Sequence, residues 1–199
     1  MKTIKALAGI AVLAVAGVAA LAYVQPASVP FSPVSDTKKT PAKEVRFSLV
    51  PSSDAIKKFL PHAKVNVTVE LRTDETGRDV LKVDASGLPP KTSFTAFMLE
   101  VPGAPFGAAE YFGDVDTDRY GKAHAQFELI VEEAFASTIV NGKRVRVDLN
   151  HVGMWFADPA DDDICFGKGG GPVTPFDGDN EAGVQAFNSA NSLPGAPLP

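Results

Sequence analysis

Seven acidic side chains lie in one Gly-rich stretch, residues 157–182, and could supply oxygen ligands to a metal ion. They are Asp158, Asp161, Asp162, Asp163, Asp177, Asp179 and Glu181. Ca²⁺ takes about six to eight oxygen ligands, and clustered carboxylates on a flexible backbone can provide them. Residues 177–181 place oxygen-bearing side chains at alternate positions, although their spacing does not match an EF-hand loop. The stretch therefore predicts either a calcium site or a solvated acidic loop.

The histidine best placed for chemistry is His151. The chain has three histidines, and none forms the His-x-His or His-x-x-x-His pair that is typical of a metal site on one strand or helix. His151 continues the alternation of Val145, Val147 and Leu149, which we expect to face the core. We therefore expect either a hydrogen-bonded histidine at the end of a core strand, or a metal ligand that works with the carboxylates of residues 157–182.

Aromatic side chains offer a second kind of site. The chain has 13 Phe but only one Trp and three Tyr, a balance that is typical of a core. Six aromatic residues nevertheless lie in or beside predicted loops: Phe106, Tyr111, Phe112, Trp155, Phe166 and Phe176. If two or three of them are exposed together, they would form a platform for a sugar or a protein.

Signatures of common enzyme classes are missing from the sequence. It has no Gly-x-Ser-x-Gly, Cys-x-x-Cys or His-Glu-x-x-His motif. Its single cysteine, Cys165, cannot form an internal disulfide, so we expect a buried, inert thiol or, alternatively, an intermolecular bridge or a reactive thiol. The sequence thus favours a protein that is not an enzyme.

The N-terminus predicts export. Lys2 and Lys5 precede an apolar run, residues 6–22, which ends in Ala-Leu-Ala, the layout of a secretory signal peptide. The alternative is an uncleaved membrane anchor formed by residues 6–24. Removal of residues 1–22 takes away two lysines and no acid, so the net charge changes from −5 to −7. This charge disfavours nucleic acid and anionic membrane surfaces as partners, and only an uncleaved anchor would bring the protein to a membrane.

Alternation of apolar and polar residues predicts the elements that must position these side chains. Two stretches with the pattern Thr-Asp-x-x-Gly, residues 73–77 and 117–121, each lie between alternating segments and predict tight hairpins. The expected strands are 44–50, 65–72, 78–85, 93–100, 110–115, 123–129, one from 144 towards 155–157, and 183–189, with a short helix at 54–60. Seven or eight short strands predict an all-β fold, an antiparallel, immunoglobulin-like β-sandwich with long loops.

One short stretch supports the sandwich. Residues 87–94, Gly-Leu-Pro-Pro-Lys-Thr-Ser-Phe, resemble the linker that precedes a late strand in fibronectin type III domains. Phe94 stands where those domains usually carry a tyrosine, and the chain that follows it is far too long for their topology. The resemblance implies sandwich architecture and no more.

Taken together, the patterns divide the chain into four segments. We expect a signal peptide or anchor (1–22), a Pro-rich linker (23–43), the β-sandwich (44–190) and a flexible C-terminal tail (191–199). The expected role is a binding or structural module at the cell exterior or in the cell envelope, with an extracellular protein or glycan as partner. The alternative is a metal-dependent extracellular enzyme that uses His151 and carboxylates of residues 157–182.

Overall fold

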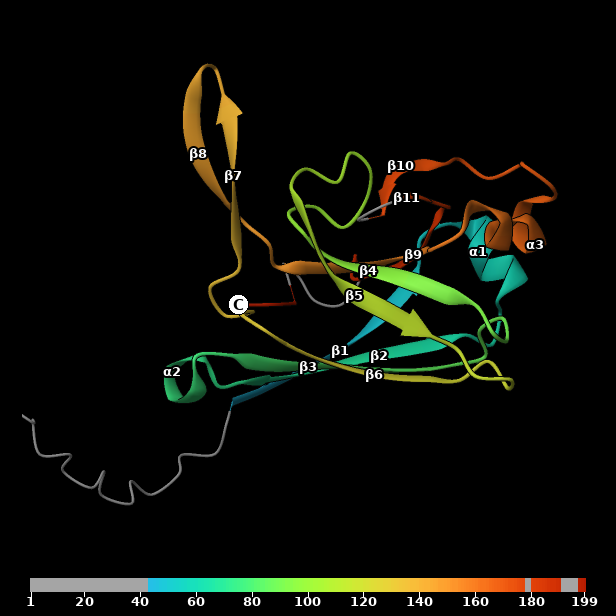
Figure 1. The fold of residues 1–199 in the computed structure, drawn as a ribbon, viewed down its shortest axis with the longest axis horizontal. Helices are drawn as coiled ribbons and strands as arrows, with labels where there is room; N and C mark the ends of the chain where they lie inside the picture. The colour runs from blue at the N-terminus through green and yellow to red at the C-terminus, as the bar shows by residue number, and fades with distance from the viewer. Residues whose placement is uncertain (1–42, 178–179, 191–196) are drawn as a thin grey trace, which may run out of the picture. The chain divides into compact units, whose positions relative to one another are not determined.

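The chain folds as an antiparallel all-β protein with few short helices. In the computed structural model, residues 43–177, 180–190 and 197–199 are described (Figure 1), so the predicted signal segment 1–22 lies outside them. The expected β-sandwich class is confirmed, although the described residues form twelve strands rather than seven or eight. Among these residues, no helix has the length and apolar character needed to cross a bilayer.

Eight strands form one antiparallel sheet that folds over into two layers. The first layer contains β1 (Lys43–Pro51), β2 (Lys64–Leu71), β3 (Asp79–Ser86) and β6 (Ala123–Leu129). The second contains β12 (Gln185–Asn188), β9 (His151–Phe156), β4 (Ser93–Leu99) and β5 (Ala109–Asp116). Strand β1 joins the layers, because residues 43–49 pair with β2 whereas Val50 and Pro51 pair with β12.

At the other end of the sheet, β5 approaches β6 and the sheet becomes nearly barrel-shaped. The rings of Phe112 and Phe127 meet edge to face there, with their centroids 5.0 Å apart. Gly113 makes room for this contact, since a Cβ atom at this position would lie 2.3 Å from Phe127 Cε1. The sheet order nevertheless ends at β5 on one side and at β6 on the other.

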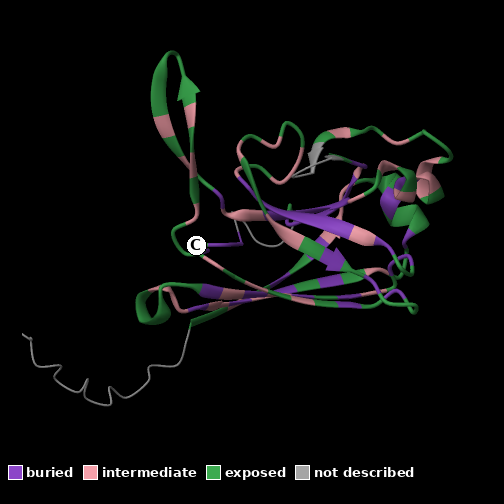
Figure 2. Ribbon diagram, viewed as in Figure 1, coloured by how far each residue is buried: buried purple, intermediate pink, exposed green. Residues whose placement is uncertain are grey.

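The core lies between the two layers, as the period-2 pattern predicts. Every second residue of β2 and β3 is buried (Figure 2). Side chains of β4 and β9 belong to the same core cluster and pack against them from the other layer. Helix α1 (Asp54–Phe59) covers one end: the Ser53 hydroxyl accepts a hydrogen bond from Ile56 N (3.3 Å), and Ile56 is fully buried. The expected short helix is therefore confirmed.

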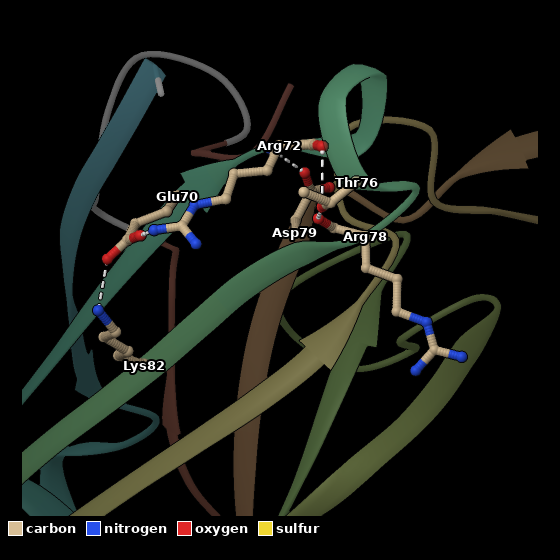
Figure 3. Close-up of polar contacts among 6 residues, drawn as sticks. All are labelled: Glu70, Arg72, Thr76, Arg78, Asp79 and Lys82. Atoms are coloured by element: carbon tan, nitrogen blue, oxygen red, sulfur yellow. Dashed lines mark hydrogen bonds and ion pairs between the residues drawn. The ribbon is translucent and has the colours of Figure 1, made fainter. Parts of the chain in front are cut away.

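The turn between β2 and β3 is anchored by Asp79. This turn contains a short helix, α2 (Thr73–Thr76), and Asp79 follows it, fully buried. The Asp79 carboxylate accepts a hydrogen bond from Arg72 N (2.6 Å; Figure 3). It also accepts from Thr73 N (2.8 Å) and the Thr73 hydroxyl (2.7 Å). It also accepts from Val131 N (2.8 Å) and Glu132 N (3.0 Å), so one side chain ties the β2–β3 turn to the segment after β6.

These hydrogen bonds decide the charge of Asp79. Burial by itself raises the pKa of this carboxyl, but the hydrogen bonds outweigh burial and the pKa lies below its ordinary value. Nearby, Glu70 forms ion pairs with both Arg72 and Lys82 (Figure 3). The buried Asp79 carboxylate is therefore ionised at neutral pH.

A two-stranded hairpin, β7 (Phe135–Val140) and β8 (Lys143–Asp148), departs from the predicted topology. Sequence analysis expected one strand from Arg144 towards residues 155–157, and this prediction was wrong. Strand β8 pairs with β7 in a separate sheet, the chain then turns at the buried Leu149, and β9 begins in the main sheet. In Figure 1 the hairpin extends away from the two layers, which explains why Val145 and Val147 are only half-buried.

Part of the segment expected to be a C-terminal tail lies against the core. Residues 191–196 are outside the described residues, whereas 197–199 are described. Leu198 is buried and its backbone N–H donates to Asn150 O (3.1 Å). The C-terminal residues that are described therefore contact the segment between β8 and β9.

Candidate ligand-binding pocket

Strands β4 and β9 carry apolar side chains on both faces. Residues at alternate positions, such as Phe94 and Met154, join the main core between the layers. Those between them lie on the outer face, where Thr95 pairs with Trp155 and Phe97 pairs with Gly153. The outer face of this layer is therefore a second apolar surface.

Trp155 is the centre of this outer surface. Its ring meets Phe97 and Phe106 edge to face, with centroid distances of 5.3 and 4.9 Å. Gly153 allows the indole to lie flat on the strand, since a Cβ atom there would be 2.6 Å from Trp155 Cζ3 and 2.8 Å from Leu99 Cδ1. The absence of a side chain at Gly153 thus fixes the position of the indole.

A pocket of about 410 Å³ opens beside the indole. Its lining is mainly apolar and has no charged residue: Phe97, Leu99, Pro105, Phe106, Gly107, Ala109, Trp155 and Thr174. A second pocket of about 480 Å³ shares Phe106, Trp155 and Thr174 with it and has more polar groups, among them Gln185 and Asn188. We call the first the aromatic pocket; Trp155 lines both.

The loop between β4 and β5 holds Phe106 over the indole. This loop is closed by backbone hydrogen bonds from Glu100 N to Ala108 O (2.9 Å) and from Val101 N to Phe106 O (3.1 Å). The Glu100 carboxylate accepts a further hydrogen bond from Ala108 N (2.9 Å). Gln185 Nε2 donates to the loop carbonyl of Pro102 (3.0 Å). The pocket wall is therefore preorganised by bonds from both ends of the loop.

Two buried polar atoms on this face have no hydrogen-bond partner within the described structure. They are Trp155 Nε1 and Thr95 Oγ1, on residues that pair directly across β9 and β4. Trp155 is 3% exposed and Thr95 is fully buried. Buried donors in folded proteins are almost always satisfied, by protein or by ordered water. The Trp155 N–H therefore needs an acceptor that the described residues do not supply, and either ordered water or a bound ligand would provide one.

The acidic stretch that sequence analysis singled out is folded, and several of its carboxylates accept hydrogen bonds from backbone N–H groups. It contains η1 (Pro159–Asp162), α3 (Asp163–Phe166), β10 (Thr174–Asp177) and β11 (Asn180–Ala182). Asp158 Oδ1 accepts from Ala160 N (2.8 Å), and Asp163 Oδ1 accepts from Gly169 N (2.5 Å). The buried Asp162 accepts from Val184 N (2.8 Å) and so ties the stretch to the approach of β12.

Within the described part of the chain, the predicted metal ligands do not come together. Among the described residues, no three or more His, Cys, Asp or Glu side chains lie close enough to hold a metal ion. Burial raises the pKa of both Asp161 and Asp162, with neighbouring carboxylates adding to the rise, and Glu181 is exposed. The Asp177 side chain and all of Asp179 are outside the described residues, so the calcium site stays a prediction.

His151 lies on the outer face rather than towards the core. It opens β9 opposite Leu99, and its expected alternation with Val145 and Val147 fails because they belong to a different sheet. His151 Nδ1 lies 3.0 Å from the Ser189 hydroxyl, which also accepts a hydrogen bond from Val152 N (3.1 Å). Burial lowers the pKa of His151. A hydrogen-bonded, neutral histidine fits this geometry, and its use as a metal ligand stays a prediction.

Cys165 is half-buried in α3. Burial, reinforced by the charge of Asp162, raises the pKa of its thiol to about 11. The thiolate is the reactive form of cysteine, so this thiol is unreactive at neutral pH. This supports the expectation of an inert cysteine.

Three of the six aromatic residues come together, but they do not form the exposed platform that was considered, because Trp155 is only 3% exposed. Phe106, Tyr111 and Trp155 gather around Phe97, with the Tyr111 ring 5.7 Å from it. Phe112 packs on Phe127, and Phe166 packs against the main core. The Phe176 side chain is outside the described residues. Sequence analysis missed Phe97 and Thr95. The feature that could have identified them is the sequence of β4, Ser-Phe-Thr-Ala-Phe-Met-Leu, because a strand that is apolar on both faces is expected to be covered on both sides.

Comparison with known proteins adds no family. No protein-family model and no curated protein matches the chain. The functional argument therefore depends on the chemistry of the pocket and on the N-terminal sequence.

Proposed function

We propose that the protein is an exported β-sandwich that binds a small, neutral, largely apolar ligand in its aromatic pocket, as a binding module at the cell exterior. The N-terminal pattern, with Lys2, Lys5 and the apolar residues 6–22, supports export. The observation that carries the proposed binding is the apolar pocket of about 410 Å³ beside Trp155, whose buried Nε1 has no hydrogen-bond partner among the described residues.

The lining defines the class of ligand. The aromatic pocket has a volume of about 410 Å³, which falls in the usual range for small-molecule sites. The rings of Phe97, Phe106 and Trp155 favour an apolar ring or a short hydrocarbon chain, and the uncharged lining favours a neutral molecule. A carbonyl, ether or hydroxyl oxygen on the ligand would accept from Trp155 N–H. A glycan is a poorer fit, because sugars stack on an exposed ring face and Trp155 is almost fully buried.

Trp155 allows a direct test, because it is the single tryptophan of the chain. We expect ethyl benzoate, which has an apolar ring and an ester carbonyl, to change the Trp155 emission saturably. Ethylbenzene, which lacks the acceptor, should bind about fivefold to tenfold more weakly, the effect of one hydrogen bond. If neither compound gives a saturable change, the proposed site is wrong.

Two variants separate the contributions of shape and hydrogen bonding. Ala109→Phe fills the pocket from β5 and should abolish binding of both compounds, whereas Ala55→Phe, on the exposed face of α1, is the matched control that should leave binding unchanged.

Trp155→Phe keeps a ring but removes the N–H, so it should remove the preference for ethyl benzoate. Because that variant lacks tryptophan, ligand-observed NMR gives its affinities. A preference that survives the substitution would exclude Trp155 as the donor.

A further inference from the structure

The β7–β8 hairpin leaves apolar side chains uncovered. Phe135, Ile139 and Val140 are 53%, 64% and 50% exposed. Strands β7 and β8 pair only with each other in the described structure, and an isolated two-stranded hairpin is marginally stable in water. Figure 2 shows the hairpin mostly green, away from the purple layers. Its composition therefore suits a partner that covers it.

The hairpin is also basic, in a chain that is acidic overall. Lys143, Arg144 and Arg146 follow one another along β8, against a net charge of −5 for the whole protein. Arg144 donates to the Ser137 hydroxyl (2.8 Å), and Arg146 lies over the Phe135 ring, 4.3 Å from its centroid. The cations are thus held on the hairpin but stay exposed. An acidic, partly apolar surface would complement them.

Such a surface lies at the foot of the hairpin. A groove of about 500 Å³ runs between β5 and β6, where the eight-stranded sheet ends on both sides. Its apolar part includes Tyr111, Leu129 and Ile130. Its charged part has three acids, Glu110, Glu128 and Glu133, and one base, Arg78. We call it the seam groove. Its apolar and acidic character complements the apolar and basic hairpin.

A molecule cannot satisfy its own seam groove in this conformation. Phe135, at the base of β7, lines the groove, but the hairpin leads away from the layers towards the turn at Asn141 and Gly142 (Figure 1). The tip could therefore reach the groove of another molecule. Two copies related by a two-fold axis would make this contact twice, which is the arrangement that a self-complementary surface favours.

We propose that two copies of this chain dimerise by placing the β7–β8 hairpin of each in the seam groove of the other. Lys143 and Arg144 of one copy then face Glu128 and Glu133 of its partner, while Ile139 and Val140 cover Tyr111 and Leu129. The sheet order ends at β5 on one side of the groove and at β6 on the other, so a docked strand would lie beside two sheet edges. This interface is separate from the aromatic pocket and does not depend on the proposed ligand.

Sedimentation velocity of the purified protein over a range of concentrations and salt tests the dimer. We expect a monomer–dimer equilibrium that weakens as salt rises, because screening reduces the attraction between the charged surfaces. The double variant Lys143→Glu/Arg144→Glu and the double variant Glu128→Lys/Glu133→Lys should each raise the dimer dissociation constant about tenfold or more. Lys64→Glu, an exposed change on β2, is the control and should leave it unchanged.

Mixing the two double variants gives the decisive result. In the mixed dimer, the acidic hairpin meets the basic groove and the original hairpin meets the original groove, so both contacts are complementary. We expect the mixture to dimerise about tenfold more tightly than either variant alone, with thermal melts showing that both are folded. A protein that stays monomeric at all concentrations, or a dimer that both double variants leave intact, would overturn the proposal.

Discussion

Two turns with the same sequence pattern, Thr-Asp-x-x-Gly, are held in different ways. In residues 117–121 the pattern works locally: Asp118 Oδ1 accepts from Tyr120 N (2.7 Å) and Lys122 N (2.9 Å) on the exposed side of the turn. In residues 73–77 the turn becomes the short helix α2, and its anchor is Asp79, beyond the pattern and bonded to two separate segments. Only residues 73–77 form the predicted hairpin, between β2 and β3; the hairpin predicted at 117–121 was wrong, because β5 and β6 lie at opposite ends of the sheet order and do not pair. The pattern thus predicts where the chain reverses but not what the flanking strands pair with or what fixes the reversal.

The glycines of the two turns differ in the same sense. Gly77 and Gly121 both have positive φ, 77° and 70°. A Cβ atom at Gly77 would meet nothing within 4 Å, whereas one at Gly121 would lie 2.0 Å from the Leu88 carbonyl oxygen. The first turn is open around its glycine and fixed by a buried acid, while the second is tightly packed at its glycine and has an exposed acid.

Removing the buried acid should have the largest effect. Asp79→Ala leaves the N–H groups of Arg72, Thr73, Val131 and Glu132 without their acceptor, so we expect a loss of about 3–5 kcal/mol in the free energy of unfolding. Urea denaturation followed by circular dichroism measures this loss. Asp118→Ala is the matched control and should cost much less. Equal losses for the two variants would contradict the difference between the turns.

The glycine pair should give the next largest effect. Gly121→Ala adds a collision with Leu88 to the cost of positive φ, and we expect a loss of about 2–4 kcal/mol. Gly77→Ala adds only the cost of a side chain at positive φ, so it should lower the free energy of unfolding by about 1 kcal/mol. The same denaturation experiment compares them. A Gly77→Ala loss as large as that of Gly121→Ala would mean that backbone conformation alone sets the cost.

The dependence of stability on pH should give the smallest effect. The pKa of Asp79 in the folded protein lies below its ordinary value of about 4, so its ionised form stabilises the fold above that pH. This stabilisation is lost as the pH falls from about 4 through the folded-state pKa. Asp79→Asn should therefore flatten the fall in melting temperature between pH 4 and pH 2. An unchanged slope would show that other carboxyl groups control acid unfolding.

The sequence predicted the fold best where one face of a strand is buried and the other is solvated. In β2, Val65, Val67 and Val69 alternate with polar residues, which defines both the strand and its inward face. The same alternation misled the prediction in β8, because Val145 and Val147 would look identical in a core strand and in an uncovered hairpin. Local pattern cannot distinguish the two, since the difference lies in what packs against the strand.

The candidate site was predictable only in part, for a similar reason. Phe106 and Trp155 stood out as aromatic residues near loops, but their meeting depends on the closed β4–β5 loop and on the position of β9 beside β4. Thr95 belongs to the candidate site because it pairs with Trp155, and these two residues are far apart in the sequence. The acidic stretch had the clearest composition, yet Asp158, Asp162 and Asp163 accept hydrogen bonds from its own and neighbouring backbone.

The pairing of β1 with β12 bears on when the protein can fold. The sheet order places β12 between β9 and β1, so the link from the first strand to the second layer needs residues close to the end of the described chain. Contacts between such distant segments form slowly, because a long loop must close before they add stability. An emerging chain cannot make this link until β12 has been synthesised. If the protein is exported as we propose, the two layers stay unlinked at β1 while the chain before β12 is synthesised and transferred across the membrane.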